Sequence, residues 1–351
     1  MKNGFKIAFV YIGLVIGAGF ASGKEVMHFF NRFGDKSYHT IFLAMFLFIF
    51  IAYIIMKKVM DYNIYDFSEY VNIVGGRFNV FFKIIIILFM FCGFCVMICA
   101  GGSVIENIFS INKSFGIWGL LIICFVVFMY DAKGIVVVNT VLVPIMILGI
   151  TYISINSYLL SEEVFLQFFL KEIKCAGDNF FVSAILYVSY NTITAASVLI
   201  PLKKYFTDKS IKTGAHIGGL ILGFLIFIIW LVIKIHYKSV SASDMPMLDI
   251  AEKSGIIYKC VYGAILYMAI ITTAVSEGFG ILSHLNLSSR NGRGIKAFAI
   301  CIIAAPVAYF GFSSLVENLY TLFGYLGILW IIVIFWDYIK NSAMFNKKKV
   351  E

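Results

Sequence analysis

The sequence predicts an all-helical integral membrane protein with about ten transmembrane helices. Of its 351 residues, 61% are hydrophobic and only 13% are charged, whereas soluble domains carry about 25% charged residues. The mean hydropathy is +0.95. Because one span needs about 20 apolar residues, the chain has room for about ten spans joined by short loops.

Apolar segments follow one another along the chain and are separated by short polar stretches. Three of these polar stretches, 60–77, 160–177 and 241–256, are amphipathic, and we expect helices on the membrane surface there. We expect spans at 5–30, 39–57, 79–104, 115–131, 135–158, 179–201, 212–236, 258–283, 295–312 and 315–338.

The distribution of Lys and Arg predicts the orientation in the membrane, because cytoplasmic loops collect these residues. With the N-terminus inside, the inner segments hold about twice as many Lys and Arg as the outer segments. We therefore expect both termini in the cytoplasm. The net charge of +9 is then a signal of topology, and we expect no nucleic-acid partner.

The first apolar segment is interrupted near its middle. Residues 16–25 read Ile-Gly-Ala-Gly-Phe-Ala-Ser-Gly-Lys-Glu. A helix in lipid satisfies its backbone polar groups internally, and a glycine cluster weakens that helix. Such a break is tolerated where the freed backbone lines a protected cavity, which in transporters is usually the substrate site.

The sixth segment, 179–201, carries a second polar centre. Ten spans with both ends inside divide into two inverted halves of five, and segments 5–30 and 179–201 then open the two halves. Interrupted segments at corresponding positions point to a transporter's binding site. The alternative is a pair of packing interfaces, since small residues also let helices approach closely. The polar residues in the middle of the sixth segment are Ser189, Tyr190, Asn191, Thr192, Thr194 and Ser197.

The nine residues Gly-Ala-Gly-Phe-Ala-Ser-Gly-Lys-Glu at 17–25 resemble the first-span signature of the bacterial YkvI-type membrane proteins. In span count and order, the resemblance extends over essentially the whole chain. These proteins are similar to the amino acid–polyamine–cation superfamily. Its LeuT-type fold is an inverted repeat of five plus five helices, with helices 1 and 6 broken at the membrane midplane.

The resemblance implies a multi-pass protein of the bacterial cytoplasmic membrane. Its two five-helix repeats would occupy residues 1–158 and 179–340. An extracellular linker with an amphipathic segment would lie at 159–178, and a basic cytoplasmic tail at 341–351.

The resemblance also places a substrate between two unwound stretches, at about 17–22 and 189–194. The half-helix after Gly19 would offer the amides of Phe20, Ala21 and Ser22 to a carboxylate, because helix N-termini carry partial positive charge. The expected substrate-binding residues are Gly17, Ala18, Gly19, Phe20, Ala21, Ser22, Tyr187, Ser189, Tyr190, Asn191 and Thr192.

An ion site follows from the same resemblance. In sodium-coupled members, one ion lies between carbonyls before the first break and an Ala-x-x-(Ser/Thr)-(Ser/Thr) motif in span 8. Residues 269–273 read Ala-Ile-Ile-Thr-Thr and match it. Positions i, i+3 and i+4 share a helix face. The alternative is that both hydroxyls only bond their own helix or pack. The implied sodium-like site consists of Gly13, Ile16, Ala269, Thr272 and Thr273.

Two sequence features limit the ions and metals that we expect. Phe20 stands where some relatives carry the Asn of a second sodium site, which argues against a second ion. The cysteines and histidines lack ligand spacing, so we expect no metal site and no cofactor beyond a coupling ion.

Charged side chains within spans are costly and are functional candidates by default. Lys24 and Glu25 follow the first break, and Glu277 lies one turn after Thr273. We expect these three residues to form an outer gate or to carry a proton. The alternative is that Glu25 and Glu277 lie near the interface and reach water.

These features favour a secondary active transporter of a small amino acid or a related amine. Alternating access would be coupled to sodium or protons. The alternative is a non-transporting, ligand-sensing membrane protein of the same fold, similar to germinant-receptor subunits. An enzyme is not expected, because no catalytic constellation or nucleotide motif is present.

Overall fold

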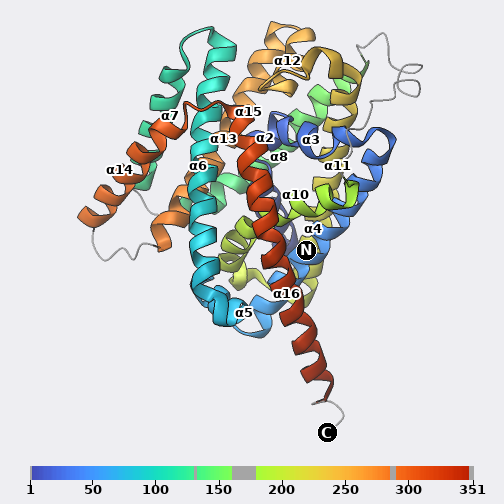
Figure 1. Ribbon diagram of the computed structural model, residues 1–351, viewed down its shortest axis with the longest axis vertical. Helices are drawn as coiled ribbons and strands as arrows, with labels where there is room; N and C mark the ends of the chain where they lie inside the picture. Colours follow the sequence, from blue (N-terminus) through green and yellow to red (C-terminus); the bar gives the residue numbers. More distant parts are fainter. Residues whose placement is uncertain (1, 130–132, 160–178, 285–289, 348–351) are drawn as a thin grey trace.

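The computed structural model describes residues 2–129, 133–159, 179–284 and 290–347. Within these ranges the chain forms helices and short turns and no β-strand, as the sequence predicted. The helices pack into one bundle, from which the end of α16 projects toward the C-terminus (Figure 1). The α-helices are α1 (Lys2–Val15), α2 (Ala18–Ala21), α3 (Lys24–Phe29), α4 (Ser37–Asp61), α5 (Phe67–Gly75), α6 (Asn79–Phe109), α7 (Lys113–Phe128), α8 (Lys133–Leu159), α10 (Phe180–Leu199), α11 (Asp208–Val240), α12 (Pro246–Lys253), α13 (Ile256–His284), α14 (Arg290–Val307), α15 (Phe312–Leu315) and α16 (Thr321–Lys347). Three 3₁₀ segments (Asn31–Lys36, Gly76–Phe78 and Ile200–Tyr205) and one π segment (Val316–Tyr320) join them.

Seven of the described helical segments are long and apolar enough to cross a membrane. Two shorter helical segments, Asn3–Val15 and Lys113–Phe128, are also apolar. The described helices lie where the sequence placed its spans, while the total of ten and the inverted repeat stay predictions. The seven segments are Ser37–Asp61, Phe67–Phe109, Leu142–Leu159, Phe180–Ser197, Asp208–Val240, Ile256–Leu282 and Phe312–Lys340.

The first span is broken, as its glycines predicted. The helix stops at Val15, resumes for the single turn of α2, and restarts at Lys24. Gly23, between α2 and α3, has a φ of +81°, a left-handed conformation that favours glycine. The expected unwinding over 17–22 is therefore corrected: the chain leaves the helix at 16–17 and 22–23 and keeps one turn between them.

The sixth predicted span is not broken, which corrects the expectation of unwinding at 189–194. Helix α10 runs without interruption from Phe180 to Leu199. It contains neither glycine nor proline, so nothing in its backbone favours a break. Its polar residues bond carbonyls of their own helix instead, as described below.

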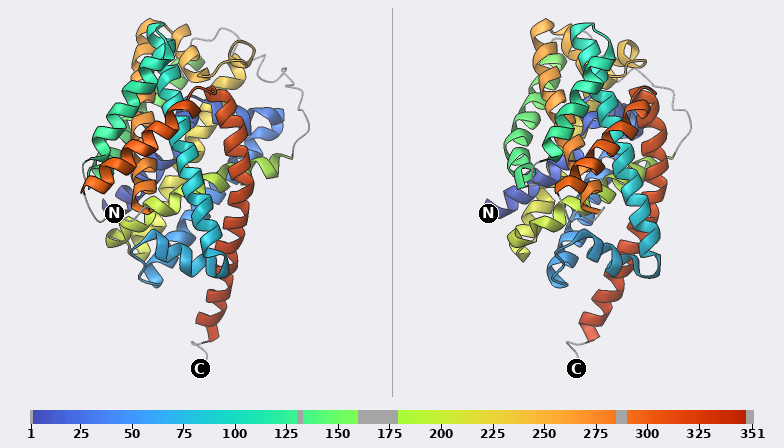
Figure 2. Two further views of the ribbon diagram at one scale, coloured as in Figure 1. Left: turned by 60° about the vertical axis from the view of Figure 1, so that its left-hand side comes forward. Right: turned by 90° about the vertical axis from the view of Figure 1, so that its left-hand side faces the viewer.

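The broken span and α10 lie among the longer helices. Helix α1 packs against α8, α10 and α11, while α10 packs against α4 and α16. Helix α13 lies along α6 and also contacts α2. Both views of Figure 2 show α6 and α16 side by side. The break in the first span is therefore enclosed by protein, which is the condition under which irregular backbone is tolerated at membrane depth.

Two of the predicted surface helices are present. Helix α5 lies within the predicted segment 60–77, and α12 lies within 241–256. The third, 160–177, lies outside the described residues. Helix α12 contacts the break directly, since the Met247 amide donates a 2.9 Å hydrogen bond to the Ser22 carbonyl.

Close packing of α6 against α7 gives a test of the fold. A Cβ on Gly116 of α7 would lie 2.6 Å from the Gly101 carbonyl oxygen and 2.8 Å from the Gly102 Cα. Backbone cannot move aside as a side chain can, so we expect Gly116→Ala to destabilise the protein by about 1–3 kcal/mol. Thermal unfolding in detergent measures this effect.

Gly119, one turn further along α7, is the matched control, because nothing lies within 4 Å of its added Cβ. Gly119→Ala should leave the unfolding temperature unchanged or raise it slightly. Equal unfolding temperatures for the two variants would contradict the packing of α6 on α7.

Candidate functional site

The break in the first span faces the hydroxyl groups of α13. A Cβ on Gly17 would lie 3.5 Å from Cγ2 and 3.6 Å from Oγ1 of Thr273. The Thr273 hydroxyl is buried and has no hydrogen-bond partner. A buried hydroxyl normally finds a partner, so this oxygen is available to a ligand.

The other expected members of the sodium-like site lie on two segments. Ala269 and Thr272 are on α13 with Thr273, and Gly13 and Ile16 are at the end of α1. The Thr272 hydroxyl donates a 2.9 Å hydrogen bond to the Ala269 carbonyl, which leaves the lone pairs of the hydroxyl free. Gly13 and Ile16 are buried at the end of α1. The structure thus brings Thr273 to the break, while convergence of all five residues on one ion stays a prediction.

Glu25, on α3, is buried with an exposed fraction of 3%. Its Oε2 accepts a 2.7 Å hydrogen bond from the Tyr190 hydroxyl on α10. Its carboxyl group lies against Gly19, where an added Cβ would collide with Oε1. Position 19 therefore requires glycine, because any side chain there would overlap the Glu25 carboxyl group.

Glu277 repeats this arrangement on α13. It is 8% exposed, and its carboxyl group lies so close to Gly93 of α6 that a Cβ there would collide with it. Its Oε2 is buried without a hydrogen-bond partner. The carboxyl groups of Glu277 and Glu25 are near enough to interact electrostatically. Both are buried, which corrects the alternative that they reach water at the interface.

Lys24, at the start of α3, forms an ion pair beyond the break. Its Nζ lies 3.3 Å from Glu317 Oε1 and donates a 3.3 Å hydrogen bond to the Ser243 carbonyl. Lys24 thus pairs with Glu317 and not with Glu25, while the gate or proton-carrier role expected of Lys24, Glu25 and Glu277 stays a prediction. Sequence analysis missed Glu317; its signal is a carboxylate at the start of the last span.

Aromatic rings pack around Tyr190, which bonds the Glu25 carboxyl group. The ring centroid of Tyr190 lies 4.9 Å from that of Tyr320, 5.5 Å from that of Tyr187 and 6.1 Å from that of Phe89. The expected tyrosines, Tyr187 and Tyr190, are therefore present beside the break. Phe89 and Tyr320 were missed because aromatic residues form 17% of the chain and single out no position.

The polar residues of α10 bond their own helix. The side chains of Ser189, Asn191 and Thr192 donate to the carbonyls of residues 185, 187 and 188, at 2.5, 2.9 and 2.7 Å. Ser189 also faces α16, since a Cβ on Gly327 would lie 2.7 Å from its carbonyl oxygen. The expected substrate role of these three side chains is therefore not supported by their contacts.

Two backbone amides at the break already donate hydrogen bonds to carbonyls of the same segment. The Ala21 amide donates to the Gly17 carbonyl at 2.9 Å, and the Ser22 amide to the Ala18 carbonyl at 2.8 Å. This corrects the expectation that the amides of Ala21 and Ser22 are free for a carboxylate, while the same role of the Phe20 amide stays a prediction. One turn of helix forms because an unsatisfied amide is costly away from water. Ala18 and Phe20 are buried in this turn.

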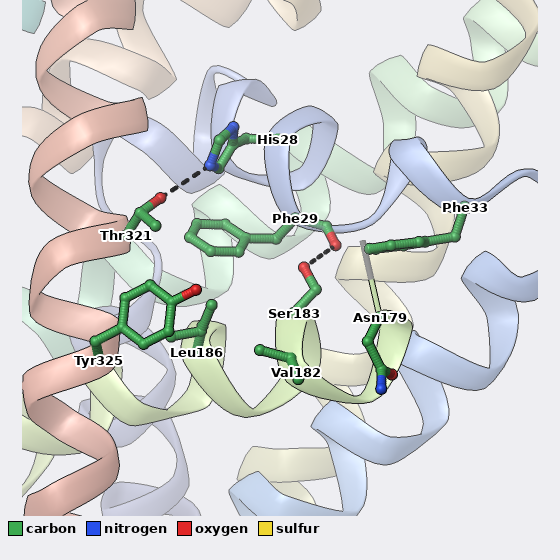
Figure 3. Close-up of a pocket in the computed structure, with 9 residues that line it drawn as sticks. All are labelled: His28, Phe29, Phe33, Asn179, Val182, Ser183, Leu186, Thr321 and Tyr325. Carbon is green, nitrogen blue, oxygen red and sulfur yellow. Dashed lines mark hydrogen bonds between the residues drawn. The ribbon is translucent and has the colours of Figure 1, made fainter. Parts of the chain in front are cut away.

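A separate pocket of about 160 Å³ lies further along α3. Figure 3 shows His28 and Thr321 joined across it, with Nε2 and Oγ1 3.1 Å apart. The Ser183 hydroxyl donates a 2.7 Å hydrogen bond to the Phe29 carbonyl. The pocket is lined by His28, Phe29, Phe33, Asn179, Val182, Ser183, Leu186, Thr321 and Tyr325.

A first span broken inside a helical bundle, with buried polar groups beside the break, is typical of secondary transporters of the LeuT fold. Comparison with solved structures agrees. The transporter MhsT in complex with L-phenylalanine aligns with a TM-score of 0.69 at 17% identity, over 95% of this chain and 88% of MhsT. A substrate-bound, Na⁺-coupled sialic acid symporter aligns with a TM-score of 0.63 at 14% identity, over 93% and 76% of the two chains.

A manganese transporter of Eremococcus coleocola aligns as well, with a TM-score of 0.66 at 13% identity. The alignment covers 94% of this chain and 78% of the transporter. At these identities the likeness concerns the fold.

Two Bacillus subtilis proteins are homologous to this chain. The uncharacterized protein YyaD is 27% identical over 334 residues, which is 93% of this chain and 94% of YyaD. The uncharacterized membrane protein YkvI is 26% identical over 336 residues, 93% of each chain. No protein-family model matches the chain. The resemblance to YkvI-type proteins with a LeuT fold is thereby confirmed.

The contact between Gly19 and Glu25 can be tested by a double-mutant cycle. We expect Gly19→Ala to destabilise the protein by about 1–3 kcal/mol, because its Cβ occupies the space of the Glu25 carboxyl group. In a Glu25→Ala background the same change should cost much less, because the carboxyl group is gone. Thermal unfolding of the four proteins measures the coupling. Equal costs in both backgrounds would show that the two residues are not in contact.

Proposed function

We propose that this protein is a secondary active transporter of a small amino acid or a related amine. The main observation behind this proposal is the broken first span. Buried polar atoms without hydrogen-bond partners, Thr273 Oγ1 and Glu277 Oε2, lie on α13, which contacts the break. Residues 1–158 and 179–340 would form the two inverted repeats, and alternating access would expose the site between them to each side in turn. The transporter folds among the solved structures support this class of function.

The Lys24–Glu317 pair would close the outer side of the site. It joins α3, beyond the break, to the π segment that precedes α16. Single-turn π segments are frequent at functional sites, because they shift a helix locally and leave carbonyls free. Opening would separate α3 from this segment, break the ion pair, and admit substrate from outside.

Coupling would use sodium or protons. Sodium would bind between the carbonyls of Gly13 and Ile16 and the Ala269, Thr272 and Thr273 face of α13. The unpartnered Thr273 hydroxyl beside Gly17 supports this site. Oxygen ligands of this kind suit a hard cation. For protons, the carriers would be Glu25 and Glu277, which are buried and have no basic partner among the described ion pairs.

Transport is tested by counterflow in proteoliposomes. The vesicles are preloaded with one unlabelled member of a panel of amino acids and their decarboxylated amines, and uptake of the same labelled compound is followed. We expect protein-dependent exchange of at least one compound. Binding of a compound without exchange would instead favour a ligand-sensing protein of the same fold.

The sodium site is tested by Thr273→Val, which removes the hydroxyl and keeps the shape. We expect the half-saturating sodium concentration for substrate binding to rise about tenfold, which corresponds to about 1.4 kcal/mol for one lost ligand.

Ser276→Ala is the control, because the Ser276 hydroxyl donates to the Thr272 carbonyl within α13 at 2.7 Å. It should leave the sodium dependence unchanged. Substrate binding that is the same in potassium as in sodium, at fixed pH, would remove the sodium site and leave the proton carriers.

A further inference from the structure

The centre of the site holds two carboxyl groups without a cation. Glu25 lies against Gly19 of the break and Glu277 against Gly93 of α6; both are buried, and neither forms an ion pair among the described residues. Glu25 receives one hydrogen bond from Tyr190, and Glu277 Oε2 receives none. Carboxylates away from water are costly unless they are paired and hydrogen-bonded. The pair thus lacks the positive charge that a bound cation would supply.

The nearest lysine in the sequence does not supply this charge. Lys24 is directed to Glu317 and to the Ser243 carbonyl on the outer side of the break. Adjacent residues on a helix do not face each other, so Lys24 cannot serve both Glu317 and Glu25 without turning away.

The rings beside the carboxyl groups also suit a cation. Phe89, Tyr190 and Tyr320 pack on one another with centroids 4.9–6.4 Å apart. Tyr190 of this cluster bonds Glu25, and Phe89 lies one turn before Gly93, the residue that Glu277 contacts, so the cluster reaches toward both carboxyl groups. An ammonium group is attracted to the faces of such rings, and more strongly where water is excluded.

Among the described ion pairs, a substrate carboxylate finds no free cation at the break, because Lys24 is paired with Glu317. The Ala21 and Ser22 amides are bonded within the break, and the Ser22 hydroxyl donates to the Gly19 carbonyl at 3.1 Å. A carboxylate placed here would face the Glu25 and Glu277 carboxyl groups. Like charges at short range in a medium of low polarity repel strongly. The site therefore discriminates against the carboxylate of an amino acid.

We propose that the substrate is a small primary amine without a carboxylate, bound as a cation between Glu25 and Glu277 and against the rings of Phe89, Tyr190 and Tyr320. Its ammonium group has three donors. One would reach the unpartnered Oε2 of Glu277, and another the Glu25 carboxyl group. Gly19 and Gly93 lack the side chains that would exclude these carboxyl groups, so both acids can lie beside the ligand. This inference rests on the proposed function only in taking the break as the substrate site.

Calorimetric titration of the purified full-length protein in detergent tests this assignment. The ligands are matched pairs that differ in one carboxylate: phenethylamine and L-phenylalanine, tyramine and L-tyrosine, cadaverine and L-lysine. We expect at least one amine to bind with a dissociation constant at least tenfold lower than that of its amino acid. An amino acid that binds as tightly as its amine, or the failure of all three amines to bind, would overturn the proposal.

Variants then locate the amine. Glu277→Gln keeps the shape of the side chain and removes its charge, and we expect it to weaken amine binding at least tenfold. Glu252→Gln is the matched control, because Glu252 pairs with Lys259 at 2.9 Å and is half-exposed. It should leave amine binding unchanged. Amine affinity unaltered in both Glu25→Gln and Glu277→Gln would overturn the placement.

The experiments separate this proposal from that of transport. The amine and amino acid titrations use wild-type protein, so they stand even if a variant does not fold. Absence of exchange in counterflow would remove transport and leave amine binding in place. Tighter binding of an amino acid would remove the amine assignment and leave the transporter in place.

Discussion

The backbone at the break of the first span needs hydrogen-bond partners, because the residues there are buried in protein. Helix α12 and helix α13 supply them. The Met247 amide donates to the Ser22 carbonyl, and the Tyr262 hydroxyl donates to the Ala21 carbonyl at 2.5 Å. The single turn of α2 adds bonds from the Ala21 and Ser22 amides to the Gly17 and Ala18 carbonyls. These hydrogen bonds from α12 and α13 hold the break in place, and the residues that face the break depend on them.

The same requirement explains why the two halves of the predicted site differ. In the first span, glycines remove the side chains that would hold a helix in place, and Gly23 adopts a left-handed conformation. In α10 the polar residues are Ser, Asn and Thr, whose side chains reach back to carbonyls of the same helix. They therefore satisfy themselves without unwinding the backbone, and the helix stays whole.

The two buried carboxyl groups each lie against a glycine of a neighbouring segment. Each buried carboxyl group occupies the space left by a glycine: Gly19 for Glu25 and Gly93 for Glu277. A pair of buried acids is costly without a cation, so such a pair in a membrane interior suggests a cation-binding function. Lys24 lies beside Glu25 in the sequence but bonds Glu317 instead, which divides an outer ion pair from an inner acidic site.

The sequence by itself determined the all-helical membrane class, the positions of the spans and the break near Gly17, because composition, hydropathy and glycine act locally. It also singled out Lys24, Glu25 and Glu277 through the cost of charge in a span. Only the tertiary structure decided that α10 is continuous, that Lys24 pairs with Glu317, and that Gly93 and Tyr320 border the acids. Those outcomes depend on residues far apart in the chain, whose contacts no local pattern records.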